Sequence, residues 1–433
     1  MPGRRRTRAT ASMAGVDEAP PSVRLNARHW QFLWLLGAAG FFTGYGGGVV
    51  TVALPQIRSS FHLSQSAASL WVALLYLAAL PAVLLARRAD LHGRRQLLVV
   101  TICGYAVATV ATAFAPSIAT FAVCQIAAGF FLGAEGALSW TVIAEELPAS
   151  GRGFGFGWLA MLAALGTGWA AILYGAILHP IGISWRVLYL ACVPVLILVA
   201  ALRRRLPESS RFVAASEHRR LAARWSELLR RPHRSRLALI CATAVLVNLT
   251  AQAGVYVVDF MQTQRHLSAT AADLILVGAG AAAIPTLILA GSASDRLGRK
   301  PVCCCFLVVS VIGLVCFFVL ARSPAALFGS LAVTYVGQFG AWPTGTGFGV
   351  ELFPTALRAL GAAAGTVFTV VGQSASFVLA GILIHAGSGL ARSVVTLAAG
   401  PLIGAVLIAV WFPETSGREL EAISVDLGGP AGV

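Results

Sequence analysis

The chain has 433 residues, of which 58% are hydrophobic and only 11% are charged, and its mean hydropathy is +0.80. Soluble globular domains carry about 25% charged residues, so this composition excludes a water-soluble protein. The formal net charge of +15 does not indicate nucleic-acid binding, because that function needs a clustered basic face on a soluble domain. We therefore expect a protein whose main solvent is lipid.

Twelve apolar segments follow one another along the chain, and each approaches the roughly 20 residues with which an α-helix crosses a bilayer. The expected spans are 30–54, 68–86, 97–115, 120–144, 155–178, 185–202, 237–261, 270–290, 302–321, 326–349, 359–384 and 394–412. The sequence thus predicts an all-α polytopic membrane protein with 12 transmembrane helices in two six-helix halves.

This pattern divides the chain into five parts. They are a disordered basic cytoplasmic tail (1–29), an N-terminal six-helix half (30–202), a cytoplasmic inter-half loop (203–236), a C-terminal six-helix half (237–412) and a cytoplasmic tail (413–433).

Basic residues are concentrated at one end of the expected helices. Of the 32 Lys and Arg residues, all but five lie in the tails and the even-numbered loops. The exceptions are Arg58, Arg186, Arg265, Arg322 and Arg392. Because loops rich in Lys and Arg stay on the cytoplasmic side, we expect both termini in the cytoplasm. We expect a multi-pass protein of the plasma (cell inner) membrane. We also expect a monomer.

Three charged motifs occur twice, always in loops at the basic end. The pairs are RADLHGRR at 88–95 with ASDRLGRK at 293–300, Glu145-x-x-Pro148-x-x-x-Arg152 with Glu351-x-x-Pro354-x-x-x-Arg358, and Pro207-Glu208-Ser209 with Pro413-Glu414-Thr415. The copies are offset by 205 residues in the first pair and by 206 in the other two. This near-constant offset indicates an internal duplication. Six helices per copy give both halves the same orientation, with a pseudo-two-fold axis along the membrane normal.

The repeated motifs, in a six-plus-six arrangement, resemble the major facilitator superfamily. PESSR at 207–211 and PETSGRELE at 413–421 narrow the resemblance to the sugar porters and to the synaptic-vesicle-protein-like and metabolite–proton symporter groups. The resemblance covers residues 30–421 and implies alternating access, with solute bound between the halves.

The resemblance also implies a cytoplasmic gate, in which charges of the two halves pair only while that side is closed. Exposed ion pairs contribute about 0–1 kcal/mol each, so a network is needed to bias the equilibrium between two states. The gate residues are Asp90, Arg94, Glu145, Arg152, Glu208 and Arg211 in the first half, and Asp295, Arg299, Glu351, Arg358, Glu414 and Arg418 in the second.

Glu135 is the ionisable residue that lies deepest in an expected span, within FFLGAEGALSW. A charge at that depth is costly and marks a functional candidate, so we expect Glu135 to carry a coupling proton. The alternative is a structural glutamate bonded to a neighbouring helix. Asp259 and Asp273 lie near the other ends of their helices, where a solvated role and a functional role are equally open.

The chain departs from the sugar porters at their coupling pair. Those transporters carry an Asp in the first helix and an Arg in the fourth, where this chain has Gly46 and Gln125. Either coupling has moved to Glu135, or the protein works without a proton.

Neutral polar and aromatic groups on the central helices are expected to bind the solute among apolar walls. Asn248, Gln252 and Tyr256 share one helical face at i, i+4 and i+8. The full set is Gln125, Asn248, Gln252, Tyr256, Gln338, Trp342, Thr366, Thr369 and Gln373. No Lys or Arg is expected at central depth, which favours a neutral or cationic solute.

The sequence favours a secondary active or facilitative transporter of a small polar organic solute, such as a sugar, a polyol or an aromatic metabolite. The alternatives are drug or natural-product efflux on the same fold and a non-transporting membrane sensor. We expect no enzyme, because no nucleophile–base pairing is present. We also expect no cofactor and no metal: consecutive helical cysteines at 303–305 point about 100° apart and cannot close one tetrahedral site.

Overall fold

The structure is a computed structural model of the chain, and it describes residues 26–78, 80–81, 94–147, 152–204, 230, 233–352 and 355–414. Throughout these residues the regular elements are helical. Ten helices are long and apolar enough to cross a membrane, and α2 and α15 complete twelve spans. The expected all-α, twelve-helix architecture is confirmed.

The twelve spans comprise single helices and helices interrupted by short π or 3₁₀ segments. The first half contains α1 (Ala27–Ser60), α2 (Gln65–Leu77), α4 (Arg94–Ala113), α5 (Ile118–Glu146), α6 (Arg152–Ala171) with η2 (Ile172–Leu178), and α7 (Arg186–Ala191) with α8 (Val193–Arg203). The second half contains α11 (His233–Val247) with η3 (Asn248–Thr250) and α12 (Ala251–Thr263), α13 (Ala269–Leu297), α14 (Arg299–Val315) with η4 (Cys316–Leu320), α15 (Pro324–Glu351), α16 (Thr355–His385), and α17 (Gly389–Leu397) with α18 (Ala399–Trp411).

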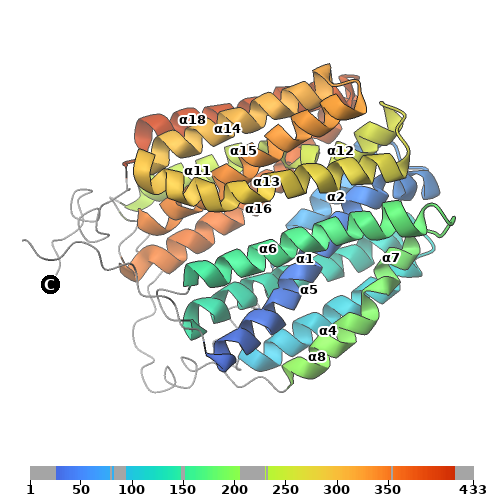
Figure 1. Cartoon of the computed structure of the whole chain (residues 1–433), viewed down its shortest axis with the longest axis horizontal. Helices are drawn as coiled ribbons and strands as arrows, with labels where there is room; N and C mark the ends of the chain where they lie inside the picture. The colour runs from blue at the N-terminus through green and yellow to red at the C-terminus, as the bar shows by residue number, and fades with distance from the viewer. Residues whose placement is uncertain are drawn as a thin grey trace, which may run out of the picture.

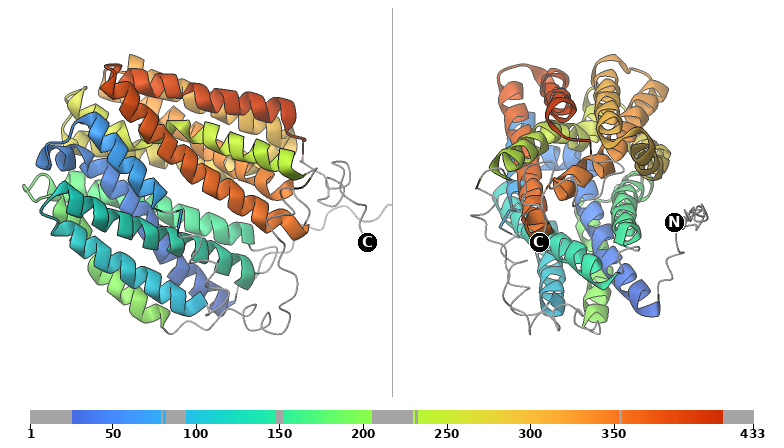
Figure 2. Two further views of the ribbon diagram at one scale, coloured as in Figure 1. Left: turned by 180° about the vertical axis from the view of Figure 1, so that it is seen from behind. Right: turned by 90° about the vertical axis from the view of Figure 1, so that its left-hand side faces the viewer.

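The two halves form two lobes whose helices run along the same long direction (Figure 1). We call the end of the bundle at which α1 begins and α18 ends the terminal end, and the opposite end the distal end. The views in Figure 2 show the same division, with blue-to-green helices in one lobe and yellow-to-red helices in the other.

Within the first lobe, small residues allow α1 and α6 to pack backbone to backbone. A Cβ atom at Gly44 would lie 1.7 Å from the carbonyl oxygen of Ala163, so only glycine fits there. Gly40 and Gly48 make similar approaches one turn to either side, and the Thr167 hydroxyl donates to the Gly44 carbonyl at 3.0 Å. Close contact of this kind is how membrane helices associate without a hydrophobic driving force. It makes α1 and α6 one rigid unit.

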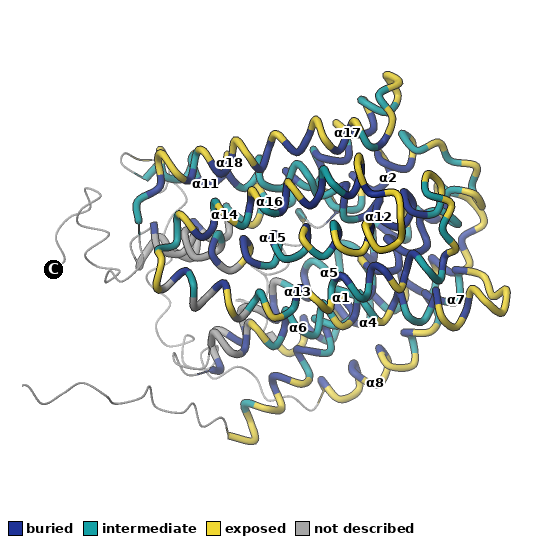
Figure 3. Tube along the Cα trace, turned by 45° about the horizontal axis from the view of Figure 1, so that its top comes forward, coloured by how far each residue is buried: buried dark blue, intermediate teal, exposed yellow. Residues whose placement is uncertain are grey.

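The buried apolar side chains form three clusters that differ in which lobes they join. A cluster at the terminal end of the first lobe includes Leu36, Leu98 and Val142. A separate cluster at the terminal end of the second lobe includes Leu307 and Ile408. The third and largest cluster, at the distal end, draws on both lobes. Among the described residues, the cluster that joins the two lobes lies toward the distal end, where the buried parts of α1, α2 and α12 converge (Figure 3).

Candidate functional site

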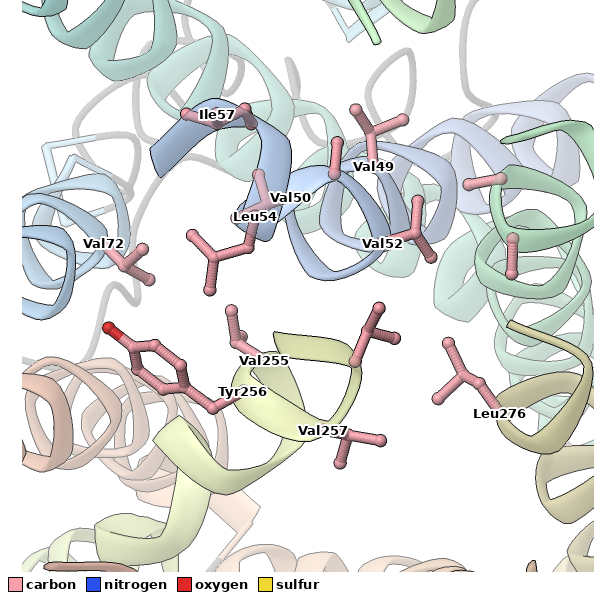
Figure 4. Close-up of a cluster of buried hydrophobic side chains, with 14 of the residues drawn as sticks. Val49, Val50, Val52, Leu54, Ile57, Val72, Val255, Tyr256, Val257 and Leu276 are labelled. Carbon is pink, nitrogen blue, oxygen red and sulfur yellow. The ribbon is translucent and has the colours of Figure 1, made fainter. Parts of the chain in front are cut away.

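The interface between the lobes is closed at the distal end by apolar side chains of α1 and α12. Val50 and Leu54 of α1 point toward Val255 and Tyr256 of α12 (Figure 4). Two further helix pairs, α2 with α16 and η2 with α13, pack across the same boundary. By contrast, the main contacts of α11, the terminal half of the same span as α12, are with α16, α18 and η3 in its own lobe. The closure is thus a feature of the distal half of the bundle.

Gln56 and Gln262 mark the pseudo-two-fold axis within this closure. They are separated by 206 residues, the offset of the repeated motifs, so they occupy equivalent positions in the two halves. Gln56 Nε2 donates to Gln262 Oε1 at 3.1 Å across the interface. Residues related by a two-fold axis meet each other only where they lie on it. This contact therefore supports the duplication inferred from the charged motifs.

A buried ion pair lies beside the axis and joins the lobes. Arg58 Nη1 of α1 lies 2.5 Å from Asp259 Oδ1 of α12, and Gln65 Nε2 of α2 donates to Asp259 Oδ2 at 2.9 Å. The Asp259 side chain is fully buried and that of Arg58 is 19% exposed. We call Arg58, Gln65 and Asp259 the distal latch. This burial excludes a solvated role for Asp259, one of the two roles left open. Arg58 belongs to α1 and forms an ion pair, whereas the sequence indicated a charge in a loop.

Tyr256 belongs to the same closure. Its hydroxyl lies 2.6 Å from the Ser69 hydroxyl and donates to the Gln65 carbonyl at 3.0 Å, both in α2. A second bond across the boundary runs from the Ser374 hydroxyl of α16 to the Ala73 carbonyl of α2 at 2.9 Å. In this state Tyr256, expected to bind solute, is fully buried and joins the two lobes.

Replacing Arg58 with Gln should weaken the distal closure, because Asp259 keeps its charge in a buried site and loses its partner. Removing one member of a buried ion pair costs about 3–5 kcal/mol, and partial exposure of Arg58 lowers that cost. We expect an Ala68→Cys probe, placed at a fully buried position of α2, to react with a hydrophilic maleimide at least ~tenfold faster. Arg58→Lys, which keeps the charge, is the matched control. Equal labelling rates in Arg58→Gln and the parent would rule out a latch.

Glu135 lies entirely within the first lobe, in a fully buried polar cluster. Its Oε1 is 2.5 Å from Arg203 Nη1 and accepts from the Ser139 hydroxyl at 3.1 Å. The Thr101 hydroxyl of α4 donates to Oε2. Both Glu135 and Arg203 have fully buried side chains. This carboxylate is therefore neutralised by an arginine and bonded on both oxygens.

Arg203 is the partner that sequence reasoning missed. It is the last residue of α8 and the first of three consecutive arginines, so it read as part of the inter-half loop. In the structure its guanidinium turns inward and donates to the carbonyls of Leu35 at 2.9 Å and Leu98 at 3.3 Å. Arg203 therefore belongs to the first lobe, at the end of α8, and not to the inter-half loop in which the sequence placed it.

The Glu135–Arg203 pair should show the energetic signature of a buried ion pair. Glu135→Leu and Arg203→Met should each lower the free energy of unfolding by about 3–5 kcal/mol, because each leaves the other group without its partner. The double variant Glu135→Leu/Arg203→Met should regain most of that loss. The measurement is thermal unfolding in detergent across the double-mutant cycle. Additive losses in the double variant would contradict the pairing.

Gly46 and Gln125, which replace the coupling pair of sugar porters, have different neighbours. A Cβ atom at Gly46 would lie 3.0 Å from the Tyr105 hydroxyl and 3.4 Å from a Leu132 methyl group. Gln125 Nε2 donates to the Thr112 hydroxyl at 3.1 Å. Tyr105 thus lies beside the place at which those porters hold their aspartate. Next to it, Gly47 borders open space.

The expected stripe of Asn248, Gln252 and Tyr256 is divided by the 3₁₀ turn η3. Asn248 Nδ2 donates to the Ala244 carbonyl of its own helix at 2.8 Å. Gln252 is fully buried and accepts at Oε1 from the Ser376 hydroxyl of α16, while its Nε2 has no partner. Tyr256, one turn further, faces α2. The three residues therefore face different neighbours.

The remaining solute candidates lie on α15 and α16 with varied exposure. Gln338, Thr369 and Gln373 are half-buried, and Thr366 and Trp342 are exposed. The structure brings Gln252 near α16, the helix that carries Thr366, Thr369 and Gln373, through Ser376.

Two residues of the expected cytoplasmic gate have described side chains, and both lie in the second lobe. Glu414 accepts from the backbone amides of Arg299 at 2.8 Å and Lys300 at 3.1 Å, which caps the start of α14. Gly298 precedes that cap with φ +97°, a left-handed conformation that glycine adopts without strain. The other gate side chains lie outside the described residues: Asp90, Arg94, Glu145, Arg152, Glu208, Arg211, Asp295, Glu351, Arg358 and Arg418.

The chain belongs to the Major Facilitator Superfamily, whose family model matches residues 36–259 and 238–427. It is therefore a multi-pass membrane transporter and not an enzyme, as the motifs predicted. The chain is 26% identical to a probable 4-methylmuconolactone transporter of Cupriavidus pinatubonensis over 353 residues, 79% of this chain and 80% of that protein. It is also 26% identical to the niacin transporter NiaP of Acinetobacter baylyi, over 42% of this chain and 41% of that one. Human synaptic vesicle glycoprotein 2A matches at 29% identity, over 42% of this chain and 26% of its own length.

Solved structures show the same fold. A crystal structure of a D-xylose-proton symporter superposes with a TM-score of 0.73 at 19% identity, over 90% of this chain and 100% of that one. A partially occluded inward open conformation of the xylose transporter XylE from E. coli also gives 0.73, at 16% identity, over 91% of this chain and 100% of that chain.

Proposed function

We propose that this protein carries a small organic solute across the membrane by alternating access, and that the structure is the state closed at the distal end. The observation that carries the proposal is the asymmetry of the lobe interface. The distal cluster contains side chains of both lobes, whereas each lobe has its own cluster at the terminal end. Two lobes whose described shared core lies at one end can rock about it to close the other end.

The terminal end is proposed to face the cytoplasm. All but five of the Lys and Arg residues lie in the tails, the loops or the helix ends at this side of the bundle, and segments rich in Lys and Arg are retained on the cytoplasmic side. The plasma (cell inner) membrane is the corresponding location. The distal latch then closes the outer side, and the solute leaves inward from the described state.

The solute proposed is a small polar organic metabolite bound near Gln252. Among the described residues, the buried donor Gln252 Nε2 has no partner, and leaving a buried donor unpaired costs about 1–3 kcal/mol. A solute acceptor at this atom would remove that cost. A probable 4-methylmuconolactone transporter that matches over most of both chains supports a lactone-type metabolite above a sugar or polyol.

We propose that Glu135 stabilises the first lobe, which is the structural alternative given in the sequence analysis. Proton coupling through Glu135 stays a prediction. Its carboxylate already has Arg203 as a counter-charge. If Glu135 carried a proton in each transport cycle, its buried ion pair with Arg203 would have to break each time. Accumulation driven by a pH gradient should therefore survive in the stable double variant Glu135→Leu/Arg203→Met, and its loss would restore Glu135 as the coupling group.

Counterflow in proteoliposomes tests transport directly. Vesicles preloaded with one unlabelled compound from a panel including 4-methylmuconolactone, niacin, D-xylose and cationic dyes should transiently accumulate the same labelled compound. We expect exchange with 4-methylmuconolactone. Exchange of the dyes alone would favour drug or natural-product efflux. Absence of exchange with every compound would favour a non-transporting sensor.

Gln252→Ala should weaken solute binding, because it removes the proposed donor. We expect the half-saturating solute concentration in counterflow to rise about 10- to 100-fold, which corresponds to about 1.4–2.8 kcal/mol, with little change in the maximal exchange rate. Asn248→Ala is the matched control, since its amide already bonds within its own helix. Equal changes in both variants would place the site elsewhere.

A further inference from the structure

Asp273 is a buried carboxyl group for which the described structure supplies no partner. It lies on the second turn of α13, is 2% exposed, and neither Oδ1 nor Oδ2 has a hydrogen-bond partner. The other two buried carboxylates discussed above, Glu135 and Asp259, are each paired with an arginine. An ionised carboxylate in such a position would carry an uncompensated charge in a medium of low dielectric constant. A proton on Asp273 is the remaining way to neutralise it.

The surroundings of Asp273 are built from the opposite lobe. A Cβ atom at Gly175 of η2 would lie 2.5 Å from Asp273 Oδ2, so the carboxyl group occupies the space that a side chain would fill. The Thr270 hydroxyl, one turn earlier on α13, donates to the Gly175 carbonyl at 2.6 Å. Gly175 is part of a π-helical segment, a local departure that is frequent at functional sites. Asp273 is therefore enclosed only while α13 and η2 remain in contact.

None of the described groups around Asp273 is paired with it. The titratable and charged groups described on the elements packed against α13 and in the adjoining loops are Tyr174 and His179 at η2, Tyr256 and Asp259 on α12, Arg265 and His266 after it, Arg322 before α15 and Tyr335 on it, and Arg299, Lys300 and Cys303–Cys305 at the start of α14. Of these, Tyr174 is close enough to interact electrostatically with Asp273. Asp259 is already bound to Arg58, and Arg299 and Lys300 lie at the opposite end of the bundle.

We propose that Asp273 is a proton-binding group whose protonation is linked to closure of the distal end, so that closure responds to pH on that side. The inference rests on the alternating-access function proposed above. With the distal end closed, the carboxyl group holds a proton against Gly175. When α13 parts from η2, Asp273 reaches water at the distal side, ionises and releases the proton there. Return to the closed state requires a proton from the same side, so one proton is taken up for each closure of the distal end.

The test measures the distal opening without solute. Nitroxide labels at Ala119→Cys and Ala325→Cys, exposed and separated by the repeat offset of 206 residues, report the distance between the lobes in a variant lacking the native cysteines. In lipid nanodiscs, the ratio of open to closed molecules should rise with pH by up to about tenfold per pH unit, the limit for one linked proton. The series runs from about pH 5 to about pH 9. Asp273→Asn should stay closed throughout.

Two further measurements keep the outcome decisive. Thr270→Val removes the bond to Gly175 and keeps the carboxyl group, so it should open more at every pH and still respond to pH. Infrared spectra at neutral pH should show the carbonyl stretch of a protonated carboxyl group, lost in Asp273→Asn and retained in Asp259→Asn. A pH-independent distance in the parent, a parental response in Asp273→Asn, or no such infrared band would each overturn the proposal. A negative counterflow panel would instead remove the transport function, so the two failures are distinguishable.

Discussion

A carboxylate buried among membrane helices has to be neutralised, and three carboxylates in this bundle meet that constraint in three ways. Glu135 is paired with Arg203 inside one lobe, where neither partner moves relative to the other as the lobes rock. Asp259 is paired with Arg58 across the lobes, so its neutralisation depends on distal closure. Asp273 has no cation and is enclosed by the other lobe's Gly175. The position of each counter-charge relative to the lobe boundary is the basis on which we propose a structural role for Glu135, a latch for Asp259 and a proton site for Asp273.

Close packing inside the first lobe makes contacts at the lobe boundary the ones that change when the lobes move. Because α1 and α6 meet backbone to backbone at Gly44, little motion can be absorbed within the first lobe. Movement is then directed to the boundary between α1 and α12, α2 and α16, and η2 and α13. Bonds that cross this boundary, such as Tyr256 to Gln65, are made or broken together. Rigid lobes turn several small contacts into one two-state equilibrium.

The sequence predicted the parts of the fold that depend on local composition and on repetition. Span length and the 206-residue offset indicated twelve helices and the duplication, and the resemblance of the repeated motifs indicated the family. The pairings were not predictable, because Arg58 and Asp259 are 201 residues apart and each resembles an ordinary charge at a helix end. Arg203 was hidden among its arginine neighbours. The stripe at Asn248, Gln252 and Tyr256 had helical spacing, but a 3₁₀ turn and two different facing helices divided it.

The contact between Gln56 and Gln262 bears on how the two copies diverged. A residue on a two-fold axis meets its own duplicate, so it has to be self-complementary, and glutamine qualifies because it both donates and accepts. The ion pair beside this contact is not repeated in the other half. The counterparts of Arg58 and Asp259 at the same offset are Gln264 and Ala53, which cannot form a second salt bridge. An ancestral dimer of identical six-helix chains could have kept the amide contact, whereas the single ionic contact belongs to a fused chain with distinguishable copies. The ion pair consequently holds the two lobes together on one side of the pseudo-two-fold axis and has no counterpart on the other.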